Sequence, residues 1–436
     1  MTNNIIKLVS KSGRRYIFDA IGNNIYEVES DRDFRSIKLQ DLGYSHDTRT
    51  DALSSESISD DVLKNAKTLI IELTEDCNFR CKYCAFDESH PQERNHSEKT
   101  LPIDAAKKEM ESFYGRTNGR EAYVVFYGGE PLLEYEKIID LVNHGNLISN
   151  GIFKYSLTTN GVLLTKDKIE FLAKNNFLIT VSIDGPQDIH DKHRISKNGK
   201  GTHKTIESNL KKILKSHPHF FAEQIEINST ISNATETGEI NEYFTSSEIF
   251  KGKEIRFSPV MQNALEINSK ISNSISLDLV NQSLKSKKPV FLKPIESSFL
   301  GDVVKKITCR KLDEEARQGK KTCTPFANRT YVRANGNIQF CERIESYGIL
   351  DAKNLRIEQL SSTLHSEFKA MKEGDCSKCF AYNFCEMCPA SFIKNGKLDY
   401  DFSRIKCDQF RTTFKNALDF YIEQCEQGGD QNAKEL

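Results

Sequence analysis

The alternation of apolar runs and helical patterns between residues 66 and 260 constrains the fold most. Six runs of strand-like composition occur at 68–73, 122–127, 154–158, 177–183, 224–229 and 254–259. Helical patterns lie between them, for example at 166–175, where Thr165 is suited to cap the helix, and at 203–216. Strands that alternate with helices form parallel sheets with right-handed crossovers. The sequence therefore predicts an α/β fold built on a partial (β/α)6 TIM-like barrel.

Three cysteines, Cys77, Cys81 and Cys84, follow the first predicted strand within the segment CNFRCKYC. In barrels of this kind the chemistry lies at the carboxyl ends of the strands. A structural zinc site is one interpretation, but such sites take four closed ligands, and no fourth Cys or His stands at the usual spacing. A four-iron cluster normally takes four cysteines, so three thiolates would leave one iron open for another ligand.

The next three strands end in segments rich in glycine and polar residues: Gly128-Gly129-Glu130-Pro131, Thr158-Thr159-Asn160-Gly161 and Ser182-Ile183-Asp184-Gly185. Glycines let a ligand approach the backbone, and Glu130 can accept a hydrogen bond from a cationic amine. The later hydroxyl, amide and carboxylate groups suit ribose hydroxyls. Each segment taken alone is also a turn signature.

Eight further cysteines occur between residues 309 and 407, namely Cys309, Cys323, Cys341, Cys376, Cys379, Cys385, Cys388 and Cys407. The block from Cys376 to Cys388 alone would be compatible with a zinc knuckle. Eight thiolates also suffice for two fully ligated four-iron clusters. Given the first cysteine loop, we expect iron–sulfur clusters here.

Composition narrows the class of protein. The 61 basic and 62 acidic residues nearly cancel, which argues against a general nucleic-acid or membrane surface. No apolar run approaches the length of a membrane span, and the first residues lack the apolar core of a signal peptide. We therefore expect a cytoplasmic protein, in which cysteines bind metal rather than form disulfides.

The remaining segments flank this barrel. Residues 1–60 form a small unit with a predicted hairpin at 15–19 and 24–28, which either caps the next domain or docks a peptide. Residues 261–308 are predicted to be a connector, 309–409 a cysteine-rich domain and 410–436 a helix and tail. Apolar residues from Phe410 to Ile422 share one helix face, and Cys425 continues that face as a packing residue.

The motifs CNFRCKYC, GGEP and SIDGP together resemble the radical S-adenosylmethionine (radical SAM) superfamily over residues 66–260. The resemblance implies that Cys77, Cys81 and Cys84 hold a [4Fe–4S] cluster whose open iron binds S-adenosylmethionine. Its implied cofactor-binding residues are Tyr83 beside the cofactor, Gly128, Gly129 and Glu130 at the methionine amine, Asn160, Ser182 and Asp184 at the ribose, and Arg194 at the carboxylate.

The later cysteines resemble the SPASM extension of enzymes that modify peptides and proteins. The resemblance implies two auxiliary [4Fe–4S] clusters, one on Cys309, Cys323, Cys341 and Cys388 and the other on Cys376, Cys379, Cys385 and Cys407. The last pair is spaced by two residues where that family commonly has three, which leaves the partition of ligands open. An electron donor such as a flavodoxin or ferredoxin is implied as a partner.

Three functions follow as hypotheses. The first is maturation of a ribosomally made precursor peptide through a thioether or carbon–carbon cross-link, because the N-terminal segment resembles the leader-binding portion of such maturases. The second is sulfatase maturation to formylglycine, in which Glu342 after Cys341 would match that family's catalytic base. The third is a non-enzymatic iron–sulfur or zinc protein, which would have no need of GGEP or SIDGP.

Overall fold

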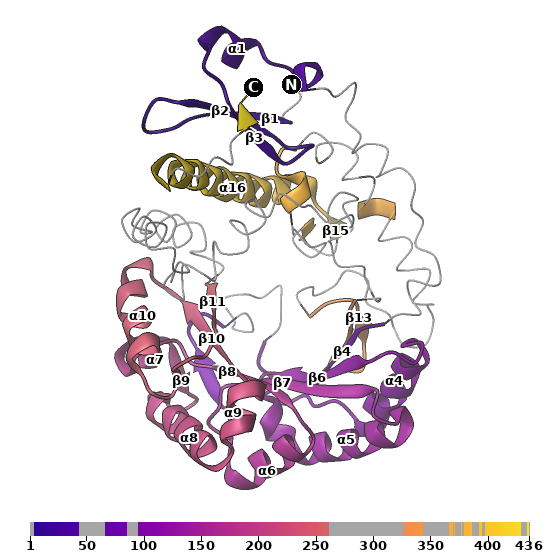
Figure 1. The fold of residues 1–436 in the computed structure, drawn as a ribbon. Helices are drawn as coiled ribbons and strands as arrows, with labels where there is room; N and C mark the ends of the chain where they lie inside the picture. The colour runs from indigo at the N-terminus through magenta and orange to yellow at the C-terminus, as the bar shows by residue number, and fades with distance from the viewer. Residues whose placement is uncertain are drawn as a thin grey trace.

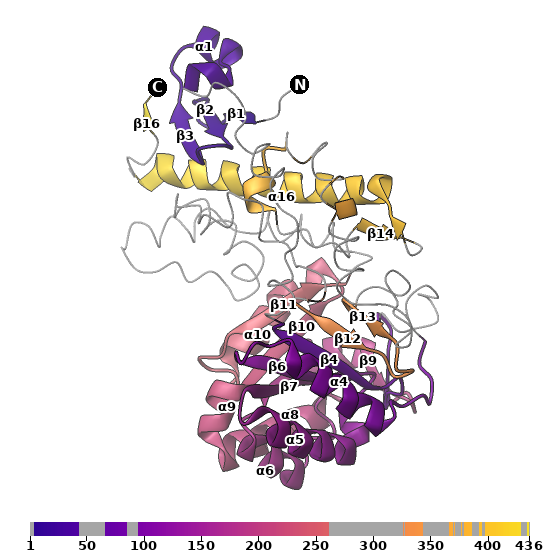
Figure 2. The same cartoon turned by 90° about the vertical axis from the view of Figure 1, so that its right-hand side faces the viewer.

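The computed structural model describes residues 4–42, 66–84, 95–260, 326, 328–342, 366–368, 370, 376, 379–385, 392–394, 397–428 and 434–435. The larger unit is an α/β barrel. A smaller unit, in which both ends of the chain meet, lies apart from the barrel in two perpendicular views (Figure 1, Figure 2). Cysteines 309, 323 and 388, and the predicted connector at 261–308, fall outside the described residues.

The barrel sheet contains the six predicted strands: β4 (Thr68–Thr74), β6 (Ala122–Gly128), β7 (Phe153–Thr159), β8 (Leu178–Ser182), β10 (Ile225–Ile231) and β11 (Ile255–Pro259). Each strand runs parallel to its neighbours in the order β11-β10-β8-β7-β6-β4. The prediction of a partial (β/α)6 barrel is confirmed. A register shift between Glu72 and Thr74 marks a β-bulge where β4 turns into the first cysteine loop.

Helices pack around the outside of this sheet: α4 (Ile103–Gly115), α5 (Tyr135–Ser149), α6 (Lys166–Lys174), α7 (Gln187–His193), α8 (His203–Ser216), α9 (Pro218–Gln224) and α10 (Thr237–Ser246) (Figure 1). The inner face of α8 buries Ile206, Leu210 and Ile213, which recur at helical spacing. Thr165 occupies the N-cap of α6, as predicted, although its side chain makes no capping hydrogen bond. Short 3₁₀ turns cover Pro131–Glu134 and Ala234–Glu236.

A hairpin from the cysteine-rich region extends the barrel sheet. Its strands are β12 (Thr330–Val332), which is parallel to β4, and β13 (Ile338–Gln339), which is antiparallel to β12. Two buried carboxylates of the β4 region hold it: Glu72 accepts from the Ala334 amide at 3.0 Å, and Glu75 lies 3.9 Å from the Arg333 guanidinium. Cys341 therefore follows a strand of the barrel sheet itself.

The smaller unit joins the two ends of the chain. Strands β1 (Ile5–Val9), β2 (Arg15–Asp19) and β3 (Asn24–Glu27) form an antiparallel sheet, and β16 (Lys434–Glu435) adds to β3 in parallel. The hairpin predicted at 15–19 and 24–28 is confirmed. Helix α1 (Asp31–Ser36) and a 3₁₀ turn (Leu39–Leu42) follow the sheet.

The long helix α16 (Tyr400–Gly428) packs across this sheet (Figure 2). The Phe18 ring contacts the rings of Phe414 and Phe384, with centroids 5.6 and 6.1 Å apart. The predicted apolar face is confirmed where it is described, and Cys425 packs partly buried against the same cluster. The helix begins at Tyr400 rather than at 410, so Cys407 lies on it.

Four short strands form two further ladders. Strand β5 (Phe79–Cys81) pairs with β9 (Arg194–Ser196), and β14 (Ile393–Lys394) pairs with β15 (Lys397–Leu398). A 3₁₀ turn spans Tyr382–Phe384. Among the helices that the structure describes, none has both the length and the apolar character needed to cross a membrane.

Candidate active site

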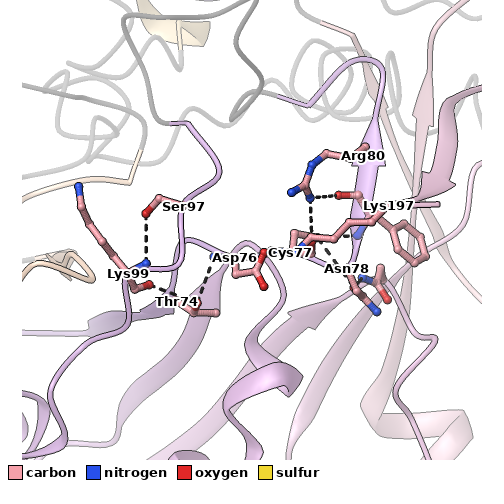
Figure 3. A network of polar contacts seen from close by, with 10 residues as sticks. Thr74, Asp76, Cys77, Asn78, Arg80, Ser97, Lys99 and Lys197 are labelled. Atoms are coloured by element: carbon pink, nitrogen blue, oxygen red, sulfur yellow. Dashed lines mark hydrogen bonds and ion pairs between the residues drawn. The ribbon is translucent and has the colours of Figure 1, made fainter. Parts of the chain in front are cut away.

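The first cysteine loop is held by its own backbone and by neighbouring polar side chains (Figure 3). The Cys77 amide donates to Asp76 Oδ1 at 2.8 Å, and Arg80 Nη1 donates to the carbonyls of Cys77 and Phe79 at 2.7 Å each. Lys197 Nζ lies 2.5 Å from the same Asp76 oxygen. These contacts hold the backbone of the loop from several sides, which is the support that a cofactor site needs.

The thiols of Cys77, Cys81 and Cys84 interact electrostatically with one another. Burial raises the pKa of Cys77 to about 12 and that of Cys81 to about 11, and nearby thiols raise both further, while Arg194 lowers the pKa of Cys81. Within the described residues, no three Cys, His, Asp or Glu side chains converge on a single ion. A cluster that binds each thiolate at a different iron does not require that convergence, so three neighbouring thiols fit one.

The two glycines of GGEP are required by packing against this loop. A Cβ atom at Gly128 would stand 2.2 Å from the Thr74 carbonyl oxygen, and one at Gly129 would stand 2.2 Å from that of Asp76. The Gly129 and Glu130 amides donate to these same two oxygens, each at 2.9 Å. The glycines thus seat the second strand end on the cysteine loop, a role that differs from the ligand approach we expected of them.

Glu130 is fully buried and accepts three hydrogen bonds. The Leu132 amide and the Thr159 hydroxyl donate to Oε1 at 3.1 and 2.8 Å, and the Asn160 amide donates to Oε2 at 2.8 Å. Burial raises its pKa, and these donors oppose that effect. A carboxylate accepts about four hydrogen bonds, so one acceptor position remains for a cationic amine.

The other predicted ribose residues lie at neighbouring strand ends. Asn160 Nδ2 donates to Asn78 Oδ1 at 2.7 Å, which ties the end of β7 to the cysteine loop. Ser182 is buried at the end of β8, opposite Asn228 of β10. The structure thus places the predicted groups at one edge of the sheet, around the loop.

The half-buried Tyr83 and the buried Asp184 and Arg194 form a polar triad beside Cys81. The Tyr83 hydroxyl donates to Asp184 Oδ2, and Arg194 Nη1 donates to the Tyr83 oxygen at 3.0 Å and lies 3.8 Å from Asp184 Oδ1. The Thr230 amide also donates to Asp184 Oδ1 at 3.0 Å. Burial raises the pKa of Asp184, while Arg194 and these hydrogen bonds counteract it.

Arg194 retains an unused donor in this triad. Its Nε is buried and has no hydrogen-bond partner among the described residues. Buried donors are normally paired, so an orphan on a guanidinium points to a missing acceptor. A carboxylate ligand beside the cysteine loop would supply one, which is the group that the superfamily resemblance assigns to this arginine.

Part of the second cysteine set gathers around α16. The Arg411 Nε donates to the Cys379 sulfur at 3.5 Å. Burial lowers the pKa of Arg411, but this hydrogen bond and the electrostatic influence of Cys379 and Cys407 outweigh burial and raise it. Cys376 and Cys379 share a tight turn, in which the Cys379 amide donates to the Cys376 carbonyl at 3.0 Å. Cys385 follows the next 3₁₀ turn. The set predicted on 376, 379, 385 and 407 is compatible with this arrangement.

Glu342, the predicted catalytic base, is engaged on both oxygens. Arg329 Nη1 donates to Oε1 at 2.8 Å, and the Cys341 thiol donates to Oε2 at 3.5 Å. Both partners belong to the β12–β13 hairpin region. The geometry holds the carboxylate beside the Cys341 sulfur.

Several residues that shape the site had no role of their own assigned from the sequence, although Thr159 and Asn78 lie within its motifs. Thr159 and Asn78 bind predicted site residues, and Arg411 contacts the second cysteine set. His190 accepts a hydrogen bond from the backbone amide of Asp184, and Thr202 donates one to the backbone carbonyl of Arg194. A hydroxyl or amide at a strand end marks Thr159 and Asn78 as candidates, whereas Arg411 sits among many charged residues on its helix and carries no such signal.

Comparison with known proteins places this site in a family context. The model of the Radical SAM superfamily matches residues 71–221. A cysteine-type anaerobic sulfatase-maturating enzyme of Clostridium novyi is 28% identical over 200 residues, which cover 45% of this chain and 50% of that enzyme. The chain therefore aligns with only half of that relative's length.

Two longer matches extend beyond the barrel. A radical SAM cyclopropyl synthase of Paramaledivibacter caminithermalis is 22% identical over 81% of this chain and 74% of its own. The structure of native anSMEcpe with bound AdoMet superposes with a TM-score of 0.58 at 19% identity, over 82% of this chain and 99% of that one. That likeness concerns the fold. The chain carries a radical SAM domain, homologous to that of the anaerobic sulfatase-maturating enzymes.

Proposed function

We propose that this chain is an enzyme that cleaves S-adenosylmethionine reductively and uses the resulting radical on a peptide or protein. The observation that carries the proposal is that the buried Nε of Arg194 has no hydrogen-bond partner among the described residues. Arg194 stands opposite Cys81 in the ladder between β5 and β9. A [4Fe–4S] cluster on the three thiols would supply the electron that releases the 5′-deoxyadenosyl radical from the cofactor.

The chain's own residues orient that cofactor. Glu130 would accept the methionine amine on its remaining lone pair, and Arg194 Nε would donate to the carboxylate. Ser182 and Asn160 would face the ribose. Both oxygens of Asp184 already accept a hydrogen bond, one from Tyr83 and one from Thr230. We therefore propose that this carboxylate holds Arg194 in position, in addition to any contact with the ribose.

Anaerobic reconstitution with iron and sulfide, followed by reduction with dithionite, tests this proposal. The wild-type protein should form 5′-deoxyadenosine from S-adenosylmethionine, and Cys81→Ala should not. Cys425→Ala is the matched control, because that cysteine packs against the small unit's apolar cluster. Absence of 5′-deoxyadenosine from reduced, iron-loaded wild type would reject the proposal.

The proposed substrate is a precursor peptide, and the proposed product is a thioether or carbon–carbon cross-link. The small N-terminal sheet would dock the leader, two auxiliary [4Fe–4S] clusters on the later cysteines would accept an electron, and a cytoplasmic flavodoxin or ferredoxin would reduce the first cluster. Support comes from the sheet of β1, β2 and β3, which packs on α16 next to the cysteine turn at 379–385.

Sulfatase maturation is the second candidate, and the Glu342 geometry favours it. Once the radical has removed a hydrogen atom from the substrate carbon, forming the carbon–heteroatom double bond requires loss of one electron and of the proton on the adjacent sulfur or oxygen. A base must take that proton, and Glu342 is held beside Cys341 by Arg329. The homology to sulfatase-maturating enzymes gives this candidate equal support.

A product assay separates the two. Peptides encoded beside this gene and a sulfatase-derived peptide are each incubated with reduced enzyme and S-adenosylmethionine. A cross-link removes two hydrogens and leaves no aldehyde, whereas formylglycine reacts with a hydrazide probe. Product from only one of the two peptides assigns the function.

A further inference from the structure

We infer that His190 and Thr202 are positioning residues that brace the cofactor pocket from behind, by coupling the backbones of Asp184 and Arg194. This inference rests on the proposed function, because those two residues form the proposed cofactor-binding triad with Tyr83. Neither His190 nor Thr202 contacts the triad's side-chain groups in the described hydrogen bonds.

The brace is a continuous chain of hydrogen bonds. The Asp184 amide donates to His190 Nδ1 at 3.2 Å, His190 Nε2 lies 3.0 Å from Thr202 Oγ1, and the Thr202 hydroxyl donates to the Arg194 carbonyl at 2.7 Å. It thus joins the end of β8 to the start of β9 through the interior, while α7 joins the same two points along the chain.

The donors and acceptors fix one tautomer of the imidazole. Nδ1 receives the Asp184 amide, so it carries no proton, and the single hydroxyl hydrogen of Thr202 is used on the Arg194 carbonyl. The proton of the neutral ring is therefore on Nε2, which donates to Thr202. His190 is fully buried, so every polar atom of this ring is satisfied within the protein.

Thr202 is itself anchored. Its backbone amide donates to Asp191 Oδ1 at 2.7 Å, and the next amide, that of His203, donates to the same oxygen at 3.0 Å. This carboxylate caps the N-terminus of α8. The brace therefore connects the pocket to a long helix of the barrel, which limits how far Arg194 can move relative to Asp184.

Threonine variants test the brace without removing the histidine. Thr202→Val keeps the shape and removes the hydroxyl, whereas Thr202→Ser keeps the hydroxyl. Thr117→Val is the matched control, because Thr117 is also buried and its hydroxyl donates to a backbone carbonyl, that of Tyr114, at 2.9 Å. Thr202→Ala is a second hydroxyl-free variant in case Thr202→Val does not fold.

Two readouts are needed. The first is amide hydrogen exchange of the cluster-free full chain, in which the segment from 183 to 196 should exchange faster in Thr202→Val than in wild type, Thr202→Ser or Thr117→Val. The second is the dissociation constant of S-adenosylmethionine for the reconstituted protein, which should rise about fivefold in Thr202→Val, the size of one lost hydrogen bond.

Unchanged exchange in this segment together with unchanged affinity in both hydroxyl-free variants would overturn the brace. Thr202→Ser that behaves like Thr202→Val would overturn it as well, since the hydroxyl would then not matter. Wild-type protein that binds no S-adenosylmethionine would instead reject the proposed function, and the exchange measurement would still decide whether the brace exists.

Discussion

Cys81 and Arg194 stand directly opposite each other in the antiparallel ladder between β5 and β9. The ladder joins the first cysteine loop to the segment after α7, so the proposed cluster ligand Cys81 and the proposed cofactor-binding residue Arg194 share one pair of strands. The Lys82 amide extends it by donating to the His193 carbonyl at 3.0 Å. A ligand that touched both Arg194 and a cluster on Cys81 would therefore bind to two strands that are hydrogen-bonded to each other.

Removing the Arg194 charge should destabilise the fold as well as the site. Arg194→Leu would leave the buried carboxylate of Asp184 without its cation, at a cost of about 3 kcal/mol in the free energy of unfolding. Urea denaturation measures this loss. The double variant with Asp184→Asn should lose less than the sum of the two single variants, because each removes the other's partner.

Arg256→Leu is the comparison for that measurement. Arg256 lies 3.4 Å from Glu226 in an exposed pair, so its loss should change the unfolding free energy by no more than about 0.5 kcal/mol. Equal losses for Arg194→Leu and Arg256→Leu would contradict the buried-triad interpretation.

Gly129→Ala should displace the cysteine loop. The new methyl group would stand 2.2 Å from the Asp76 carbonyl oxygen, a backbone atom that can move only with Cys77 beside it. We expect a loss of about 3 kcal/mol in unfolding free energy and a lower iron content after reconstitution.

Gly238→Ala controls for the added methyl group. Gly238 lies in α10 with nothing within 4 Å of its Cβ position, so alanine should stabilise that helix by up to about 1 kcal/mol. If Gly129→Ala reconstitutes as fully as Gly238→Ala, the glycine is not required for packing.

The sequence was sufficient to predict the barrel and which strand ends meet around the first cysteine loop, because local patterns specify both, whereas the roles of the site residues stay predictions. Apolar runs of strand composition identified the six strands, and residues that end successive parallel strands must meet at one edge. Cys77, Glu130 and Asn160 are brought together in this way, and Asp184 lies near Cys81 of the same loop.

Long-range pairing could not be predicted in the same way. The β12–β13 hairpin pairs with β4, from which it is separated in sequence by more than half of the chain. Its only signal in the sequence is two short apolar runs on either side of Asn335-Gly336. Glu72 interrupts an apolar run and gives no hint that it receives the Ala334 amide. The His190–Thr202 contact likewise depends on how α7 returns toward β9, which no local pattern specifies.

Acid should destabilise the fold through His190. Burial lowers the pKa of His190 to about 2, and the charges of Arg194 and His203 lower it further, whereas the unfolded chain has the ordinary value near 6.5. Below that ordinary value the unfolded state binds a proton that the folded state does not, so stability falls as the pH falls.

The size of this effect can be measured by urea denaturation at two pH values. Between pH 7.5 and 5.5, His190 should cost about 1.4 kcal/mol of unfolding free energy. His190→Asn should lose less stability over the same range, since it removes the titrating group. An identical pH dependence in both proteins would show that His190 is not held neutral.

Arg411 should support the cysteines that gather at α16. Its guanidinium donates to the Cys379 sulfur and interacts electrostatically with Cys379 and Cys407. Arg411→Leu would therefore remove a cation that lies beside the proposed ligands of an auxiliary cluster. We expect a lower iron content after reconstitution, with the first site still able to form 5′-deoxyadenosine. Arg404→Leu is the matched control on the same helix, because Arg404 is exposed and lies 4.0 Å from Asp401. Equal iron content in the two variants would mean that Arg411 serves packing alone, whereas loss of 5′-deoxyadenosine in Arg411→Leu would mean that the two cysteine sets are not independent.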